Sequence, residues 1–388
     1  MKKIGIISSL CLAFILFFQT EMKAQGDLPD PLIFENGKKV RNARQWTEKR
    51  RDEILEIFAR EMYGHVPSKP EGLHFETISE HSVYDGLGIR KTVRIYLDVQ
   101  KEHWFDVLLH LPENVSGPVP VFVGLNFQGN DATLDERADF RWPYEMILRS
   151  GMGVATAWRD SIEPDGKDSR IADEDICRDG GVRSWYNEDG DWGAISAWAW
   201  GLSRIMDYME TDPAIDCSKV VVMGHSRLGK TALWAGANDT RFSMVISNDS
   251  GCCGAALSRR VYGENFEIIA STFPHWFTPE FRKYMGNEAA FPADQHWLLA
   301  LAAPRPLYVA SATEDQWADP EGEWLSASLT SPVYALFGLD GLNDSMPEPD
   351  TPDKDAHVGY HIRTGAHNIL AYDWEQYISF AHHHFMTE

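Results

Sequence analysis

Two spacings of apolar residues alternate along this chain, one typical of helices and one typical of strands. In residues 41–63, apolar side chains recur every three or four positions, at Trp46, Ile54, Ile57, Phe58 and Met62. That periodicity predicts an amphipathic helix with one face on a core. Residues 192–210 predict a second long helix.

Short apolar runs rich in β-branched and aromatic residues predict the strands. Three lie in a leading antiparallel section, at 74–80, 88–97 and 104–111. Six more follow, at 118–125, 153–157, 220–223, 243–247, 307–311 and 333–337. Because strands and helices alternate in this second part, we predict an α/β fold: a mostly parallel sheet flanked by helices, forming a three-layer sandwich. No repeat or interdomain linker interrupts the pattern, so residues 25–388 are predicted to form a single domain.

The first residues predict a targeting segment. Lys2 and Lys3 precede an apolar run from Ile4 to Phe18, and Ala24 offers a cleavage point, so residues 1–24 match a signal peptide. The apolar run is short for a membrane-spanning helix. We therefore expect export to the periplasm or beyond, with no membrane insertion after cleavage.

Charge and cysteine content narrow the class of protein. The formal net charge of −22 over 388 residues argues against a nucleic-acid partner, because phosphate binding needs a basic face. Once the signal peptide is removed, Cys177, Cys217, Cys252 and Cys253 remain, without metal-ligand spacing. An oxidising compartment permits a disulfide between Cys217 and one of the adjacent pair, and buried free thiols are the alternative.

The candidate chemistry centres on a serine at a predicted strand-to-helix turn. The run 220–223 leads into Gly224-His225-Ser226, and residues 231–235 then predict a helix. A serine on such a turn is how α/β-hydrolases expose their nucleophile, with nearby glycines that relieve crowding. The second glycine comes one residue later than usual, at Gly229. Residues 126–130 follow the first strongly buried strand, where these enzymes keep an oxyanion-hole loop.

A serine nucleophile needs a histidine base, and in α/β-hydrolases the chain order is serine, acid, histidine. Residues 363–368 form a polar, loop-like segment around His367, which suits a mobile base. The other histidines in this part of the chain are His357, His361 and the run 382–384.

The acid has two main candidates. Asp315 follows the run 307–311, where most α/β-hydrolases place it, and Asp249 follows the run 243–247. Glu314 is a weaker third. Either aspartate satisfies the chain order, so spacing alone leaves the choice open.

An ordered set of motifs resembles carbohydrate esterase family 15, the glucuronoyl esterases. The nucleophile motif is Gly-x-Ser-Arg-x-Gly-Lys at 224–230. Further resembling segments follow in order at 248–251, 263–264, 274–277, 294–296, 303–307 and 315–317. The resemblance covers nearly all of the chain from about Arg41 onward and implies the α/β-hydrolase fold.

The resemblance also implies roles for individual residues. Ser226 corresponds to the nucleophile, His367 to the base and Arg227 to an oxyanion-stabilising residue. Lys230, Glu264 and Trp317 correspond to the residues that hold the glucuronoyl sugar through its hydroxyls and ring face. Positive side chains are disfavoured at a helix start, which independently favours a functional role for Arg227 and Lys230.

The family places its acid at either of two positions, which match Asp249 and Asp315. Fungal members have Glu where Asp249 stands, and the shorter Asp reaches less far, so Asp315 is favoured. Fungal members also carry Cys where His225 stands, so their disulfide at that point is absent here.

The activity implied by the resemblance is hydrolysis of esters of the glucuronic-acid carboxyl group, such as lignin–glucuronoxylan cross-links, without metal or organic cofactor. The implied partner is plant cell-wall glucuronoxylan or a lignin–carbohydrate ester, and we expect a monomer. Two alternatives are another carbohydrate esterase, such as an acetylxylan esterase on the same fold, and a noncatalytic glycan-binding relative. Arg227 and Lys230 argue against a deacetylase, because an acetyl group needs no clamp on sugar hydroxyls.

Overall fold

The structure is a computed structural model that describes residues 28–134, 139–166, 180–186 and 192–385. The predicted signal peptide and Cys177 lie outside these residues. In the described part of the chain, no helix is both long and apolar enough to span a membrane.

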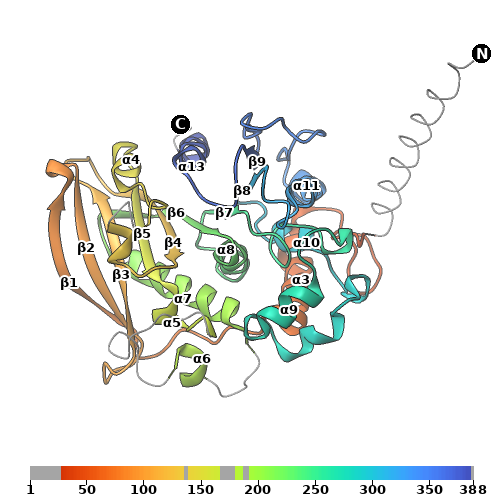
Figure 1. Ribbon diagram of the computed structural model, residues 1–388, viewed down its shortest axis with the longest axis horizontal. Helices are drawn as coiled ribbons and strands as arrows, with labels where there is room; N and C mark the ends of the chain where they lie inside the picture. Colours follow the sequence, from red (N-terminus) through yellow and green to blue (C-terminus); the bar gives the residue numbers. More distant parts are fainter. Residues whose placement is uncertain (1–27, 135–138, 167–179, 187–191, 386–388) are drawn as a thin grey trace, which may run out of the picture.

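Strands of the described residues form one mixed sheet in the order β1-β2-β3-β5-β4-β6-β7-β8-β9 (Figure 1). The first three strands and β5 pair antiparallel, and every pairing from β5 through β4 to β9 is parallel. The strands are β1 (His74–Val83), β2 (Gly88–Tyr96), β3 (Trp104–Pro112), β4 (Val119–Asn126), β5 (Gly153–Trp158), β6 (Ile215–His225), β7 (Met244–Asn248), β8 (Leu307–Ala312) and β9 (Val358–Arg363).

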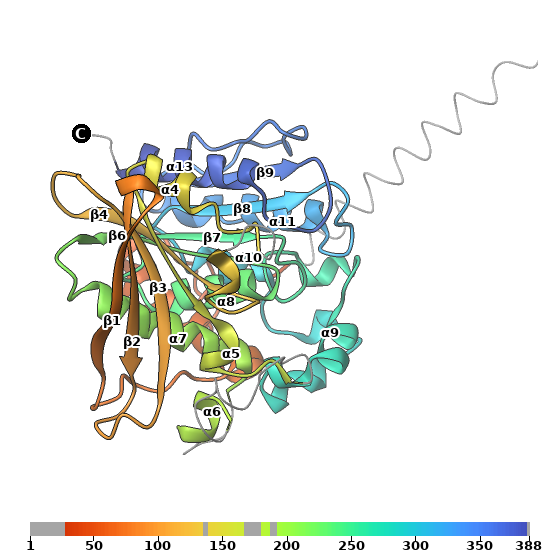
Figure 2. The same cartoon turned by 60° about the vertical axis from the view of Figure 1, so that its left-hand side comes forward.

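Helices cover both faces of this sheet, which confirms the predicted three-layer α/β architecture (Figure 2). Helices α3, α7, α8 and α10 pack on one face, and α4 and α13 pack on the other. The helices are α2 (Ala43–Gln45), α3 (Arg51–Phe58), α4 (Tyr144–Arg149), α5 (Arg159–Ile162), α6 (Val182–Trp185), α7 (Ala194–Met209), α8 (Arg227–Asn238), α9 (Phe266–Thr272), α10 (Gln295–Ala300), α11 (Pro320–Ser328), α12 (Ser331–Ala335) and α13 (Ala371–Phe385).

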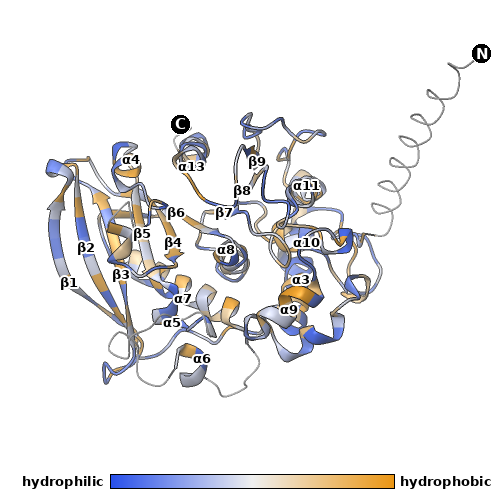
Figure 3. Cartoon of the chain, in the orientation of Figure 1, coloured by the Kyte–Doolittle hydropathy of each residue, from blue (hydrophilic) through white to orange (hydrophobic). Residues whose placement is uncertain are grey.

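The central strands are apolar on both faces because each face lies under helices. In β4, Val121 and Val123 join the core beneath α7 and α8, whereas Phe122 joins the core beneath α13. Figure 3 shows the contrast between the largely hydrophobic β4 and the more hydrophilic edge strand β1. Burial on both faces explains why the central strands are continuous apolar runs, without alternation of apolar and polar residues.

One predicted strand was wrong, and one strand was not predicted. The run 333–337 was predicted as a strand, but Val333 and Tyr334 lie in the buried helix α12. A short apolar run is equally compatible with a buried helical turn, and Pro332 suits the first turn of a helix. The last strand is instead β9. Its sequence does not form an apolar run, because the buried His361 and Arg363 are polar.

The three described cysteines differ in exposure. Cys217 is exposed, while Cys252 and Cys253 are buried, and all three are free thiols. The predicted disulfide is therefore absent among them.

Candidate active site

Ser226 occupies the tight turn between β6 and α8, as predicted. Its backbone has φ 57° and ψ −128°, a conformation unusual for a residue other than glycine. A side chain at Gly224 would come within 2.0 Å of the Leu228 carbonyl oxygen, so only glycine fits there. At Gly229 an added Cβ would lie 2.9 Å from Ser250. The late second glycine therefore still relieves crowding behind the turn.

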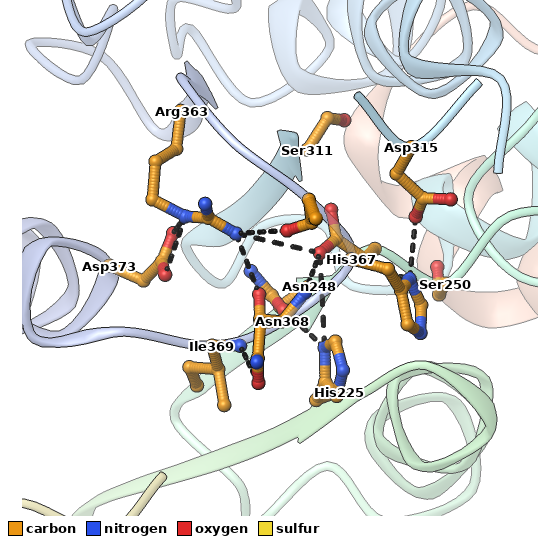
Figure 4. A network of polar contacts seen from close by, with 12 residues as sticks. His225, Asn248, Ser250, Ser311, Asp315, Arg363, His367, Asn368, Ile369 and Asp373 are labelled. Carbon is orange, nitrogen blue, oxygen red and sulfur yellow. Dashed lines mark hydrogen bonds and ion pairs between the residues drawn. The ribbon is translucent and has the colours of Figure 1, made fainter. Parts of the chain in front are cut away.

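His367 lies in the loop between β9 and α13, where Figure 4 shows it beside Asp315. The His367 Nδ1 atom is 2.6 Å from Asp315 Oδ2, and the histidine side chain is 43% exposed. Arg363 accounts for the shape of this loop, because its guanidinium donates to the carbonyl oxygens of Thr364, Ala366 and Asn368. The base therefore sits on a loop held by a buried cation.

His361, another histidine considered from the sequence, is fully buried in β9. Its Nε2 atom lies 2.8 Å from Asp373, and its Nδ1 atom contacts the Tyr308 hydroxyl. Both ring nitrogens are occupied, so His361 belongs to the core.

Asp249 lies near His367 but does not hydrogen-bond to it. Its Oδ2 atom is 4.0 Å from His367 Nδ1, from His225 Nδ1 and from Arg363 Nη2, and it accepts the Asn368 backbone N–H at 3.2 Å. Burial, followed by neighbouring carboxylates, raises the pKa of Asp249 well above its usual range. Of the two acids left open by spacing, Asp315 has the direct contact.

His225 precedes the serine and packs against the predicted base. The His225 and His367 rings have centroids 4.5 Å apart, and His225 Nδ1 is 2.5 Å from Asn248 Oδ1. Burial, followed by the neighbouring His367, lowers the pKa of His225 well below its usual range. His225 is therefore a neutral ring that links the serine turn to β7.

Arg227 contacts a carboxylate and two aromatic rings, and the sequence did not predict these contacts. Its Nη1 atom donates to Asp165 Oδ2 at 2.5 Å, and its guanidinium lies 5.0 and 4.7 Å from the ring centroids of Phe273 and Trp276. Asp165 falls in the aperiodic segment 159–191, where a single Asp gives no recognisable signal.

Lys230, Glu264 and Trp317 lie next to one another. Lys230 is 4% exposed, and its Nζ atom lies 2.5 Å from the Ser250 carbonyl oxygen and 4.0 Å from Glu264 Oε2. The Glu264 backbone N–H donates to the Trp317 carbonyl oxygen at 3.0 Å, and the Trp317 side chain is 55% exposed. A buried cation, a carboxylate and an open indole therefore lie together.

A cavity of about 780 Å³ opens beside the serine. Ser226, Arg227 and His367 line it on one side, and the predicted oxyanion loop contributes residues 127–130. Lys230, Glu264 and Trp317 do not line this cavity. Ser226 therefore lines a cavity from which the side chains of these three residues are absent.

Within the described residues, one group has the spacing of a cation site. Ligand atoms of Asp249, Asp315 and His367 lie within 4.8 Å of one another. These are the same side chains as the predicted acids and base, so a cation bound among them would replace the contact between His367 Nδ1 and Asp315.

Comparison with known proteins identifies relatives of the whole described fold. The family model described as glucuronyl esterase of fungi matches residues 97–338. A carbohydrate esterase from an unknown prokaryotic organism is 43% identical over 395 residues, which covers 92% of this chain and 89% of that protein.

Two solved structures have the same arrangement. The glucuronoyl esterase from Solibacter usitatus superposes with a TM-score of 0.85 at 41% identity, covering 92% of this chain and 98% of that chain. A promiscuous esterase of carbohydrate esterase family 15 from a marine bacterial metagenome gives a TM-score of 0.83 at 42% identity, covering 92% and 97%.

Proposed function

Because the chain belongs to the glucuronoyl esterases of carbohydrate esterase family 15, we propose that it cleaves glucuronic-acid esters through a covalent acyl-enzyme on Ser226. Membership makes the protein a carboxylic ester hydrolase. The observation that carries the mechanism is the 2.6 Å contact of Asp315 with His367, which lines the same cavity as Ser226.

In this mechanism the Ser226 hydroxyl attacks the C6 carbonyl carbon while His367 takes the proton. The Nδ1–H of His367 donates to Asp315, which leaves Nε2 as the proton acceptor and stabilises the imidazolium that forms. His367 then protonates the departing alcohol. Water, activated by the same histidine, hydrolyses the glucuronoyl ester of Ser226 and releases glucuronate.

Arg227 is proposed to stabilise the oxyanion of each tetrahedral intermediate. Replacing Arg227 with alanine is expected to lower kcat about 10²- to 10³-fold, because one preorganised donor is lost from the transition state. Steady-state kinetics on benzyl glucuronate would measure this change. Near-normal kcat in Arg227→Ala would contradict the assignment.

Lys230 and Glu264 are proposed to hold sugar hydroxyls as donor and acceptor, with Trp317 against the ring face. Lys230→Ala is expected to raise KM for the uronate ester about 10- to 100-fold, the cost of one charge-assisted hydrogen bond. Lys91→Ala is the matched control, because Lys91 is also paired with an acid, Asp212, and is shielded from solvent in part, but lies in β2. Equal KM changes in both variants would contradict a sugar-binding role.

The substrate class is tested by assaying the mature protein on benzyl glucuronate and on acetylated xylan. We expect hydrolysis of the uronate ester with little acetate release. Acetate release without uronate hydrolysis would assign the protein to the deacetylases, and Lys230 would then have no sugar-acid role. Absence of both activities would favour a glycan-binding protein.

The proposed natural substrate is a glucuronoyl ester of plant cell-wall polymers, such as a lignin–glucuronoxylan cross-link. Such a polymer cannot enter the cell, which agrees with the export predicted from residues 1–24. We propose that the mature enzyme acts in the periplasm or outside the cell, as a monomer.

A further inference from the structure

One buried carboxylate ties together several elements around the proposed oxyanion site. Asp165 is 2% exposed and accepts four side-chain contacts. Its Oδ2 atom accepts from Arg227 at 2.5 Å and also from Arg159. Its Oδ1 atom accepts from Trp276 Nε1 at 2.7 Å and lies 2.9 Å from His275 Nε2. Both oxygens are therefore fully used.

These contacts join segments that are far apart in sequence. Asp165 follows α5, Arg227 begins α8, and Trp276 ends the short 3₁₀ helix η7 (Pro274–Trp276). Trp276 also stacks on Phe273 at a centroid distance of 3.9 Å, and Arg227 lies against both rings. The Arg227 guanidinium is thus held in its plane by two rings and along one edge by Asp165.

Charge explains why this carboxylate can be buried. Burial alone would raise the pKa of Asp165, but the hydrogen bond from His275 and the charges of Arg159 and Arg227 outweigh it and lower that pKa. Asp165 is therefore anionic throughout the neutral range. The neighbouring Asp160 differs, because burial raises its pKa to about 6.

A guanidinium at the end of a flexible chain stabilises an oxyanion well only if its donors already face the reacting oxygen. Displacement of a catalytic group by about 1 Å can cost 10²-fold in rate. Arg227 directly follows the serine and lines the cavity with it, where the proposed reaction takes place. What restrains the guanidinium then decides how preorganised the site is.

We propose that Asp165 is the positioning residue of this active site: it orients Arg227 toward the developing oxyanion through a salt bridge shared with Arg159. The inference rests on the proposed function of Arg227. Asp165 is not a third candidate acid for His367. Its side-chain contacts are with Arg159, Arg227, His275 and Trp276, and none of them is with His367.

The test is Asp165→Asn, which keeps the size of the side chain and removes its charge. An amide offers one oxygen and one NH2 group, so the NH2 group would face two of the four present partners in place of an acceptor. We expect kcat on benzyl glucuronate to fall about 10- to 100-fold, with KM within about threefold of wild type. A displaced Arg227 weakens the transition state more than substrate binding.

Positioning is separated from general structural damage by a double-mutant cycle. In an Arg227→Ala background, Asp165→Asn should lower kcat by less than about twofold further, since the group it orients is gone. Independent, multiplicative losses would overturn the proposal. So would a change confined to KM.

Asp207→Asn is the matched control, because Asp207 is also buried and bound to two arginines, Arg204 and Arg241, but lies in α7. It should lower thermal stability and leave kcat of the folded protein unchanged. If Asp165→Asn fails to fold, Trp276→Phe removes one hydrogen bond to Asp165 while its charge stays. That variant should lower kcat about 3- to 10-fold, and the loss should again vanish with Arg227→Ala.

The possible failures are distinguishable. A wild type inactive on benzyl glucuronate overturns the proposed function and this inference with it. An active wild type and an impaired Arg227→Ala, combined with wild-type kcat in Asp165→Asn or, where that variant does not fold, in Trp276→Phe, overturn the inference alone.

Discussion

Replacing Ser226 with alanine is expected to lower kcat on benzyl glucuronate by about 10⁴- to 10⁶-fold, the scale seen when a hydrolase loses its nucleophile. Without the hydroxyl no acyl-enzyme forms, and only the oxyanion site and substrate binding remain. Alanine fits the same backbone conformation because it adds no atoms to the turn. Stopped assays at high enzyme concentration would measure the residual rate.

The control for this variant is Ser326→Ala in α11, which removes a buried serine hydroxyl that has no hydrogen-bond partner in the described structure. It should keep wild-type kcat. Substrate should also still bind Ser226→Ala with near-normal affinity. Substantial turnover by Ser226→Ala would contradict the covalent mechanism.

The two candidate acids are expected to differ sharply when each is replaced by asparagine. Asp315→Asn should lower kcat about 10²- to 10⁴-fold, because an amide at 2.6 Å from His367 Nδ1 no longer stabilises the imidazolium and can select the wrong tautomer. Asp249→Asn should lower kcat less than about tenfold.

The reason lies in the surroundings of Asp249. Burial, followed by the charges of Glu323, Asp315 and Asp373, raises its pKa well above its usual range and so disfavours its charged form. The amide of asparagine is neutral and has a similar shape. The amide oxygen can also accept the Asn368 backbone N–H in the same way.

Steady-state kinetics at pH 7 on both variants, with circular dichroism to verify folding, would measure this difference. The reverse order of effects would assign the acid to Asp249. Equal, large losses in both variants would mean that the two carboxyls act together on His367.

Local structure could be predicted from the sequence where residues adjacent in the chain determine it. The glycines around Ser226 and the apolar run before it specify a strand, a tight turn and a helix, and the structure has these elements there. The alternation of apolar runs and helical segments likewise predicted the layered sheet. The strand prediction for residues 333–337 was wrong because a run of five apolar residues suits a buried helix equally well.

Contacts between residues that are far apart in the sequence could not be predicted in this way. Asp315 and Asp249 both satisfy the chain order, and their contacts with His367 differ by only 1.4 Å, from 4.0 to 2.6 Å. Hydrogen bonding depends steeply on such differences, and no spacing along the chain records them.

Periodicity and local steric limits were enough to predict the fold class, the serine turn and the residue types available for catalysis. In contrast, the contact of Asp315 with His367 and the contact of Asp165 with Arg227 are visible in the folded chain alone. Those contacts depend on how β6, β8 and the segment after α5 pack together. That packing sets both the distances between charges and the burial that shifts their pKa values.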